Sequence, residues 1–136
     1  MAQNPTKPTA IEAVKDQIAR TLRIIDHRIE GLTKEMNEDY LRFFEWQAET
    51  MFKEQKRRAF YIALSEAMNE RDETIELSAW LLAIAARKGN AIINGSLTRN
   101  STNQMANHAH LLNLQTEQEL ITEIEGLASA AEYFSK

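Results

Sequence analysis

The sequence contains no cysteine and very few residues that interrupt a helix. Only two prolines and four glycines occur among its 136 residues. The absence of cysteine excludes disulfides, thiolate catalysis and cysteine-ligated zinc or iron–sulfur sites. Both prolines, Pro5 and Pro8, lie near the start of the chain, so no proline breaks a helix hydrogen bond from Thr9 onward. Long helices are therefore expected.

Long apolar runs and an obvious targeting segment are also lacking. The longest apolar run, Ala79–Ala86, is far shorter than the roughly 20 residues of a membrane-spanning helix. Residues 1–9 do not contain the apolar stretch of a signal peptide. We therefore expect a cytoplasmic protein that does not insert into membranes. Residues 1–9 are expected to be a flexible tail, and residues 10–136 a single helical domain.

Apolar residues recur every three or four positions along two long segments, which is the spacing of one helix face. These segments are Ala10–Met36 and Gln104–Phe134. Thr9 and Glu12 fit a capping box at the start of the first segment. In such a box the hydroxyl accepts a backbone N–H, and the carboxylate reaches back to the backbone of the capping residue.

A further helix is expected over Asp72–Lys88, with Asp72 or Thr74 as its N-cap and Gly89 in the left-handed position after its end. Because its central eight residues are all apolar, this helix is expected to be the most buried. Residues 90–103 are expected to be mainly loop, with a short helical turn near its start. The pattern predicts an all-α fold, an elongated antiparallel bundle of three to four long helices.

The remaining helix, expected over Glu38–Asn69 with Asn37 as its N-cap, is apolar on two opposite sides. The first face carries Leu41, Phe44, Ala48, Met51, Phe52, Ala59, Ile62 and Ala63. The second face carries Phe43, Trp46, Thr50, Lys53, Arg57, Tyr61, Leu64 and Met68, with Phe60 at its flank. A helix with two faces to cover lies inside a bundle or at a subunit interface. The sequence leaves both alternatives open.

Motifs that would indicate catalysis or metal binding are missing. The three histidines, His27, His108 and His110, all lack the glutamate three positions earlier that a di-iron helical bundle requires. His108 and His110 point in nearly opposite directions on a helix, so they are poorly placed to chelate one ion. No glycine-rich phosphate loop or nucleophile elbow occurs. We expect no metal, no cofactor and no enzymatic activity, with an enzyme of unrecognised mechanism as a remaining alternative.

The second face of this helix suggests a function in protein association. Aromatic residues are enriched at protein interfaces. We therefore expect a non-catalytic assembly protein that associates with itself, and we expect the substitution Trp46→Ala to weaken that association. The expected interface residues are Phe43, Trp46, Phe60, Tyr61 and Leu64.

The same region suggests an alternative function in nucleic-acid binding. Its cations Lys53, Lys56, Arg57 and Arg58 lie among aromatic side chains, and such a surface contacts phosphates and stacks on bases. The mild net charge of −4 is unfavourable for a general nucleic-acid binder. Glutamates within one helical turn also suggest a simpler role for the cations, in salt bridges on the helix itself.

Overall fold

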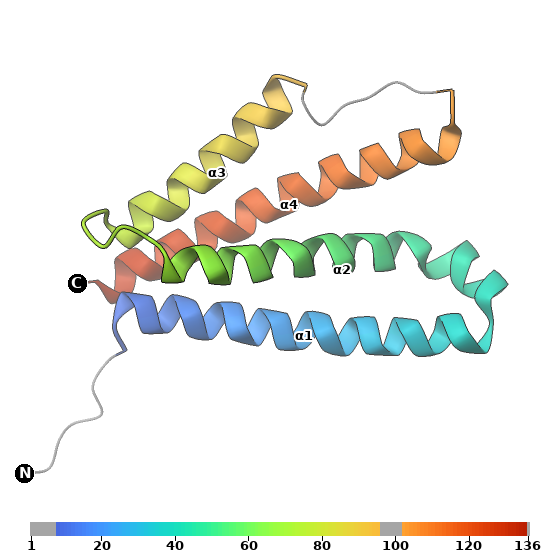
Figure 1. Cartoon of the computed structure of the whole chain (residues 1–136), viewed down its shortest axis with the longest axis horizontal. Helices are drawn as coiled ribbons and strands as arrows, with labels where there is room; N and C mark the ends of the chain where they lie inside the picture. Colours follow the sequence, from blue (N-terminus) through green and yellow to red (C-terminus); the bar gives the residue numbers. More distant parts are fainter. Residues whose placement is uncertain (1–7, 96–101, 136) are drawn as a thin grey trace, which may run out of the picture.

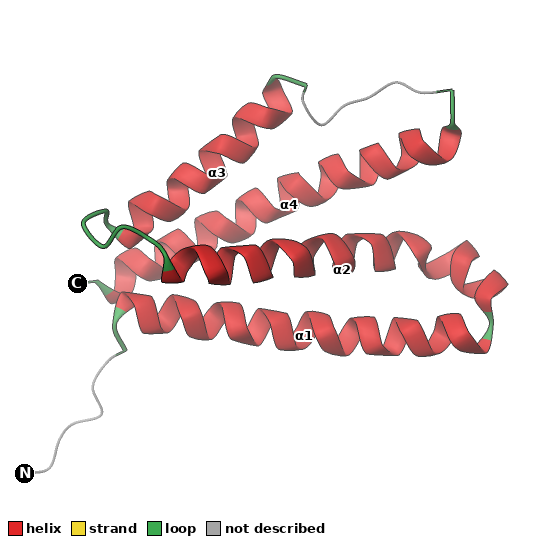
Figure 2. Cartoon of the chain, in the orientation of Figure 1, coloured by secondary structure: helices red, strands yellow, loops and turns green. Residues whose placement is uncertain are grey.

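The computed structural model describes residues 8–95 and 102–135, and nearly all of them are helical. They form α1 (Ala10–Glu38), α2 (Tyr40–Asn69), α3 (Leu77–Ile93) and α4 (Gln104–Phe134), with no strand in these ranges (Figures 1 and 2). The predicted all-α helical bundle is therefore confirmed. Residues 1–7, most of the expected tail, lie outside the described residues. None of the four helices has the combination of length and apolar character that crossing a bilayer requires.

Side-chain caps begin both helices of the first pair. At α1, the Thr9 hydroxyl oxygen accepts from the Glu12 backbone N–H at 3.2 Å, as predicted. The Glu12 carboxylate accepts from the Thr9 hydroxyl at 3.0 Å. Asp39 alone separates α1 from α2, and its carboxylate accepts from the Arg42 N–H at 3.1 Å. Asn37 was the wrong choice of cap because α1 continues through it, so Asp39 is the first side chain free to accept.

Ion pairs show how α2 lies against its two neighbours. The pairs are Arg58–Asp26 at 2.6 Å and Glu54–Arg28 at 3.6 Å toward α1, and Lys53–Glu119 at 3.1 Å and Arg57–Glu123 at 2.6 Å toward α4. Moving along α2, the partners on α1 step backward, whereas the partners on α4 step forward. Accordingly α2 turns back along α1, and α2 and α4 run in the same direction (Figure 1).

The four helices share one apolar core, located toward the end of the molecule where α1 begins and α4 ends. It contains Val14, Ile18, Ile25, Tyr61, Leu64, Met68, Leu77, Leu81, Ala85, Leu120, Ile124, Leu127, Ala128 and Ala131. Toward the other end, α3 and α4 diverge from the α1–α2 pair (Figure 1). The N-terminal half of α2 is therefore left with fewer neighbours than its C-terminal half.

The third helix combines a buried side with an exposed one. α3 packs mainly against α4, so only one of its sides is covered. Leu81 and Ala85 are buried on that side, while Ala79, Ala83 and Ala86 are exposed. Four of the 17 residues of α3 are buried, against seven of the 31 residues of α4, so the two helices are buried to a similar extent. The helix that contacts each of the other three is α4.

Both predicted boundaries of the third helix also need correction. The Asp72 carboxylate does not cap a helix; it accepts from the Thr74 N–H at 3.0 Å and from the Thr74 hydroxyl at 2.7 Å, closing a local turn. These hydrogen bonds hold the pKa of Asp72 below its usual value. α3 begins only at Leu77 and continues through Gly89. The left-handed position belongs to Gly95, whose φ is 72°.

The two faces of helix α2 as the candidate functional site

The predicted interface face of α2 points largely into the molecule. Phe43, Tyr61 and Leu64 are buried, with 6 %, 3 % and 3 % of their surface exposed, and Phe60 is half-buried. Only Trp46, at 72 % exposure, lies at the surface. The reason is that α1 and α4 cover this side of α2 along its C-terminal half. Three of the five expected interface residues therefore belong to the interior of the single chain.

A polar network replaces apolar packing in the middle of this inner side. The Arg57 guanidinium and the Tyr61 hydroxyl both donate to Glu123 at 2.6 Å. Burial lowers the pKa of Arg57, but the negative charges of Glu123 and Glu54 outweigh it, so the net shift is upward. Burial and the hydrogen bond to Glu123 raise the pKa of Tyr61 well above its usual value.

Glu54 is the one buried carboxylate of this network, with 6 % of its surface exposed. One of its oxygens lies 3.6 Å from Arg28 and 3.5 Å from Arg57, and the other has no hydrogen-bond partner. A groove of about 580 Å³ between α1, α2 and α4 adjoins the network, with Arg28, Arg57, Tyr61 and Glu123 in its lining. The groove carries charges of both signs, which does not indicate one class of ligand.

Three of the four cations expected to contact nucleic acid are paired with carboxylates on other helices. Lys53 binds Glu119, Arg57 binds Glu123 and Arg58 binds Asp26. Lys56 is half-buried and forms no ion pair with any residue that the structure describes. A phosphate would have to displace these carboxylates before it reached Lys53, Arg57 or Arg58.

The sequence reasoning missed the acidic partners of these cations. Of the expected glutamates on the same helix, Glu54 does lie 3.5 Å from Arg57. The shorter ion pairs, however, use Glu119 and Glu123 on α4 and Asp26 on α1. A signal was present in the spacing. The two glutamates on α4, Glu119 and Glu123, are four residues apart, and so are the two cations on α2, Lys53 and Arg57. On helices that run in the same direction, this equal spacing lets each cation face one glutamate.

The side of α2 opposite these ion pairs to α1 and α4 carries an apolar surface. We call it the outer face; its members are Leu41, Phe44, Ala48, Met51, Phe52, Gln55, Ala59, Ile62 and Ala63. Leu41 is 80 % exposed and Phe44 48 %. The others range from half-buried to exposed, and Gln55 is the only polar one. This surface is the first of the two faces that the sequence predicted.

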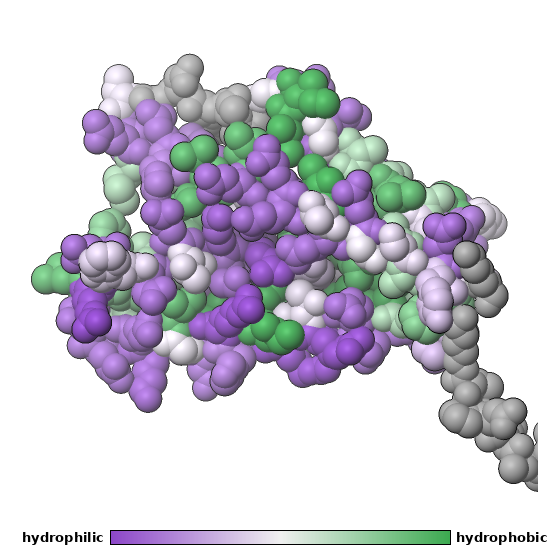
Figure 3. Space-filling view, turned by 180° about the vertical axis from the view of Figure 1, so that it is seen from behind, coloured by the Kyte–Doolittle hydropathy of each residue, from purple (hydrophilic) through white to green (hydrophobic). Residues whose placement is uncertain are grey.

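The outer face extends to the end of the α1–α2 hairpin. There Tyr40, which is 58 % exposed, packs its ring 6.2 Å from that of Phe44. Seen from behind, the molecular surface is mainly hydrophilic with separated apolar patches (Figure 3). Exposed apolar patches are typical of contact sites, and the exposed apolar members of this face are Leu41, Phe44, Ala59 and Ala63.

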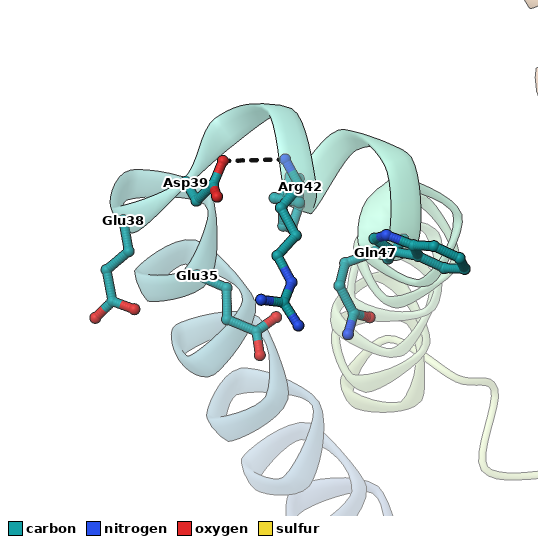
Figure 4. Close-up of a pocket in the computed structure, with 7 residues that line it drawn as sticks. Glu35, Glu38, Asp39, Arg42 and Gln47 are labelled. Carbon is teal, nitrogen blue, oxygen red and sulfur yellow. Dashed lines mark hydrogen bonds between the residues drawn. The ribbon is translucent and has the colours of Figure 1, made fainter.

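A hollow of about 390 Å³ lies at the turn of the same hairpin, with Trp46 in its lining. Glu35 and Arg42 point toward one another across it, while Glu38 points away (Figure 4). Three carboxylates and one guanidinium give the lining a net negative charge. Within residues 8–95 and 102–135, no three histidine or acidic side chains are grouped as metal ligands would be.

Comparison with known proteins does not identify the chain. No protein-family model matches it, no curated protein matches it, and no solved structure matches its fold. The functional argument therefore depends on the geometry of α2.

Proposed function

We propose that this protein is a non-catalytic assembly protein that associates with itself through the outer face of α2. The observation that supports this proposal is the position of the outer face, which runs along the side of α2 opposite the ion pairs to α1 and α4. Leu41 and Phe44 are its most exposed large members. This proposal keeps the self-association expected from the sequence and moves it to the other side of the helix.

The physical reason for association is the cost of leaving these side chains in water. Covering a leucine or phenylalanine completely contributes about 1.5–3 kcal/mol. Within the chain, the inner side of α2 packs against the other helices, and its residues Tyr61, Leu64 and Met68 belong to the shared core. No residue that the structure describes fully covers Leu41 or Phe44, so contact with another molecule would remove them from water.

The nucleic-acid alternative has less support from the geometry. Stacking and phosphate contacts require cations and rings that a nucleic acid can reach. Tyr61 is buried and Arg57 has 17 % of its side chain exposed. Trp46 is the one exposed aromatic residue of that predicted surface.

The experiment is a light-scattering mass measurement on a sizing column over a range of protein concentrations. The test variant carries Leu41→Ser and Phe44→Ser, which remove apolar area without removing any described core residue. The matched control is Trp46→Ala, because Trp46 is also an exposed aromatic residue of α2 but lies on the other side. Circular dichroism verifies that each variant keeps its helix content.

We expect a dimer or larger species for the wild type and for Trp46→Ala, and a monomer for the double variant. A wild type that remains monomeric at the highest attainable concentration would reject self-association. If Trp46→Ala dissociates the protein and the double variant does not, the association uses the originally predicted face. A raised 260 nm absorbance on the same peak would instead support nucleic-acid binding.

A further inference from the structure

Charged residues follow one edge of the outer face, and they differ in sign along it. Glu45, Glu49 and Lys56 are four and seven residues apart, so they line the same edge of α2. The Glu49 side chain is 65 % exposed, and one of its oxygens lies 3.3 Å from Nε2 of His108. The other edge carries the cation Arg58, which is already bonded to Asp26.

We propose that a second copy of the chain docks on the outer face antiparallel, about a two-fold axis beside Phe52. In this arrangement Glu49 of each copy faces Lys56 of the other. The inference rests on the proposed self-association and adds its orientation and register.

The charges favour the antiparallel orientation. In an antiparallel helix pair each edge meets the same edge of the partner. Glu49 and Lys56 are equally far from the point between Phe52 and Lys53. A two-fold axis at that point therefore brings Glu49 of the first copy to Lys56 of the second, and Lys56 of the first copy to Glu49 of the second. In a parallel pair, this edge would meet the edge that carries Arg58, which offers Lys56 no opposite charge.

The sizes of the apolar side chains favour the same orientation. Leu41 lies in the N-terminal half of the outer face, and the small residues Ala59 and Ala63 lie in its C-terminal half, on either side of Ile62. An antiparallel partner about this axis places Leu41 against Ala63, a large side chain against a small one, which lets the two helices pack closely there. A parallel partner would place Phe44 against its own copy.

Single cysteines test the orientation directly, because the chain has none of its own. We expect Phe52→Cys to form a disulfide-linked dimer under mild oxidation, since it lies next to the axis. Gln55→Cys, read with a short thiol crosslinker, repeats the test without removing an aromatic ring. Leu41→Cys should not link to itself, because its two copies would be about 34 Å apart at 1.5 Å per residue. A mixture of Leu41→Cys and Ala63→Cys should link across the two variants.

Self-linking of Leu41→Cys would overturn the antiparallel arrangement while leaving self-association intact. If no variant links and light scattering shows a monomer, the proposed function itself fails. The two failures are therefore distinguishable.

Charge reversal tests the register. Glu49→Lys and Lys56→Glu each replace two attractive contacts per dimer by two repulsive ones, so we expect each to weaken dimerisation about tenfold. The combined variant restores the pairs with their signs exchanged and should dimerise within about twofold of the wild type. Glu45→Lys is the matched control on the same edge and should change dimerisation less, because no cation faces it in this register. A combined variant no better than the single ones would reject the Glu49–Lys56 pairing.

Discussion

Tyr61 and Arg57, one turn apart on α2, donate hydrogen bonds to the same oxygen atom, Oε1 of Glu123 on α4, each at 2.6 Å. A carboxylate that accepts from a guanidinium makes a charge-assisted hydrogen bond, which is stronger than a neutral one. The position of α2 on α4 therefore depends strongly on a single acidic side chain.

Removal of that side chain should destabilise the fold more than removal of its neighbour. We expect Glu123→Ala to lower the free energy of unfolding by about 1–3 kcal/mol, because Arg57 and Tyr61 lose their acceptor in a partly buried place. Glu119→Ala removes the more exposed pair with Lys53 and should cost at most about 1 kcal/mol. Urea unfolding followed by circular dichroism measures both. Equal losses for the two variants would contradict the unequal roles assigned here.

The raised pKa of Tyr61 predicts a loss of stability in alkali. The unfolded phenol ionises near its usual pKa of 10.0, while the folded phenol stays neutral to higher pH. The stabilisation from neutral Tyr61 is therefore complete below pH 10 and is lost as the pH rises through the folded value. Compared with Tyr61→Phe, the wild type should lose about 1.4 kcal/mol per pH unit between pH 10.0 and the folded pKa.

Unfolding curves of both proteins at several pH values, up to the alkaline limit of folding, measure this difference. The phenolate absorbance gives an independent reading, since the Tyr61 phenol should ionise at a higher pH in the folded protein than in the unfolded chain. If the absorbance difference between the wild type and Tyr61→Phe showed Tyr61 ionising near pH 10.0 in the folded protein, that result would contradict the burial of Tyr61.

Glycines inside helices should be replaceable with a gain in stability. Apart from its two chain neighbours and the nearby backbone of its own helix, a Cβ added at Gly31 or Gly89 would meet no atom within 4 Å. We expect Gly31→Ala and Gly89→Ala each to raise the free energy of unfolding by about 0.5–1 kcal/mol, because alanine loses less backbone entropy in a helix. Gly95→Ala is the contrasting variant and should destabilise, since φ at Gly95 is 72°. Thermal unfolding of the three variants shows whether each substitution raises or lowers the stability of the protein.

Helix α3 should open more readily than the rest of the bundle. It packs mainly on α4, and no side chain caps its first turn. Lys88 links it further, through an ion pair with Glu117 and by lying 4.5 Å from the centre of the Phe60 ring. We expect amide hydrogens of α3 to exchange faster than those of the C-terminal half of α4. Lys88→Ala should speed exchange in α3 and leave α1 unchanged, whereas a uniform change along the chain would argue against local opening.

The hydrophobic spacing of the sequence predicted all four helices, because a chain without internal proline and with apolar residues every three or four positions has few other ways to bury them. α1, α2 and α4 begin and end within two residues of the predicted positions. α3 was displaced at both ends by local effects, the turn held by Asp72 and Thr74 and the tolerance of a helix for Gly89.

The sequence by itself also determined that α2 has two apolar faces, because that property depends only on residue order and helical geometry. Only the tertiary structure decided which of them is inside. That choice depends on acidic residues such as Glu123, which lies far from Arg57 in the sequence and reaches it only when α4 packs alongside α2. The face of α2 whose charges pair with a neighbouring helix is the one that is buried. The uncharged face, which includes Leu41 and Phe44, is left at the surface.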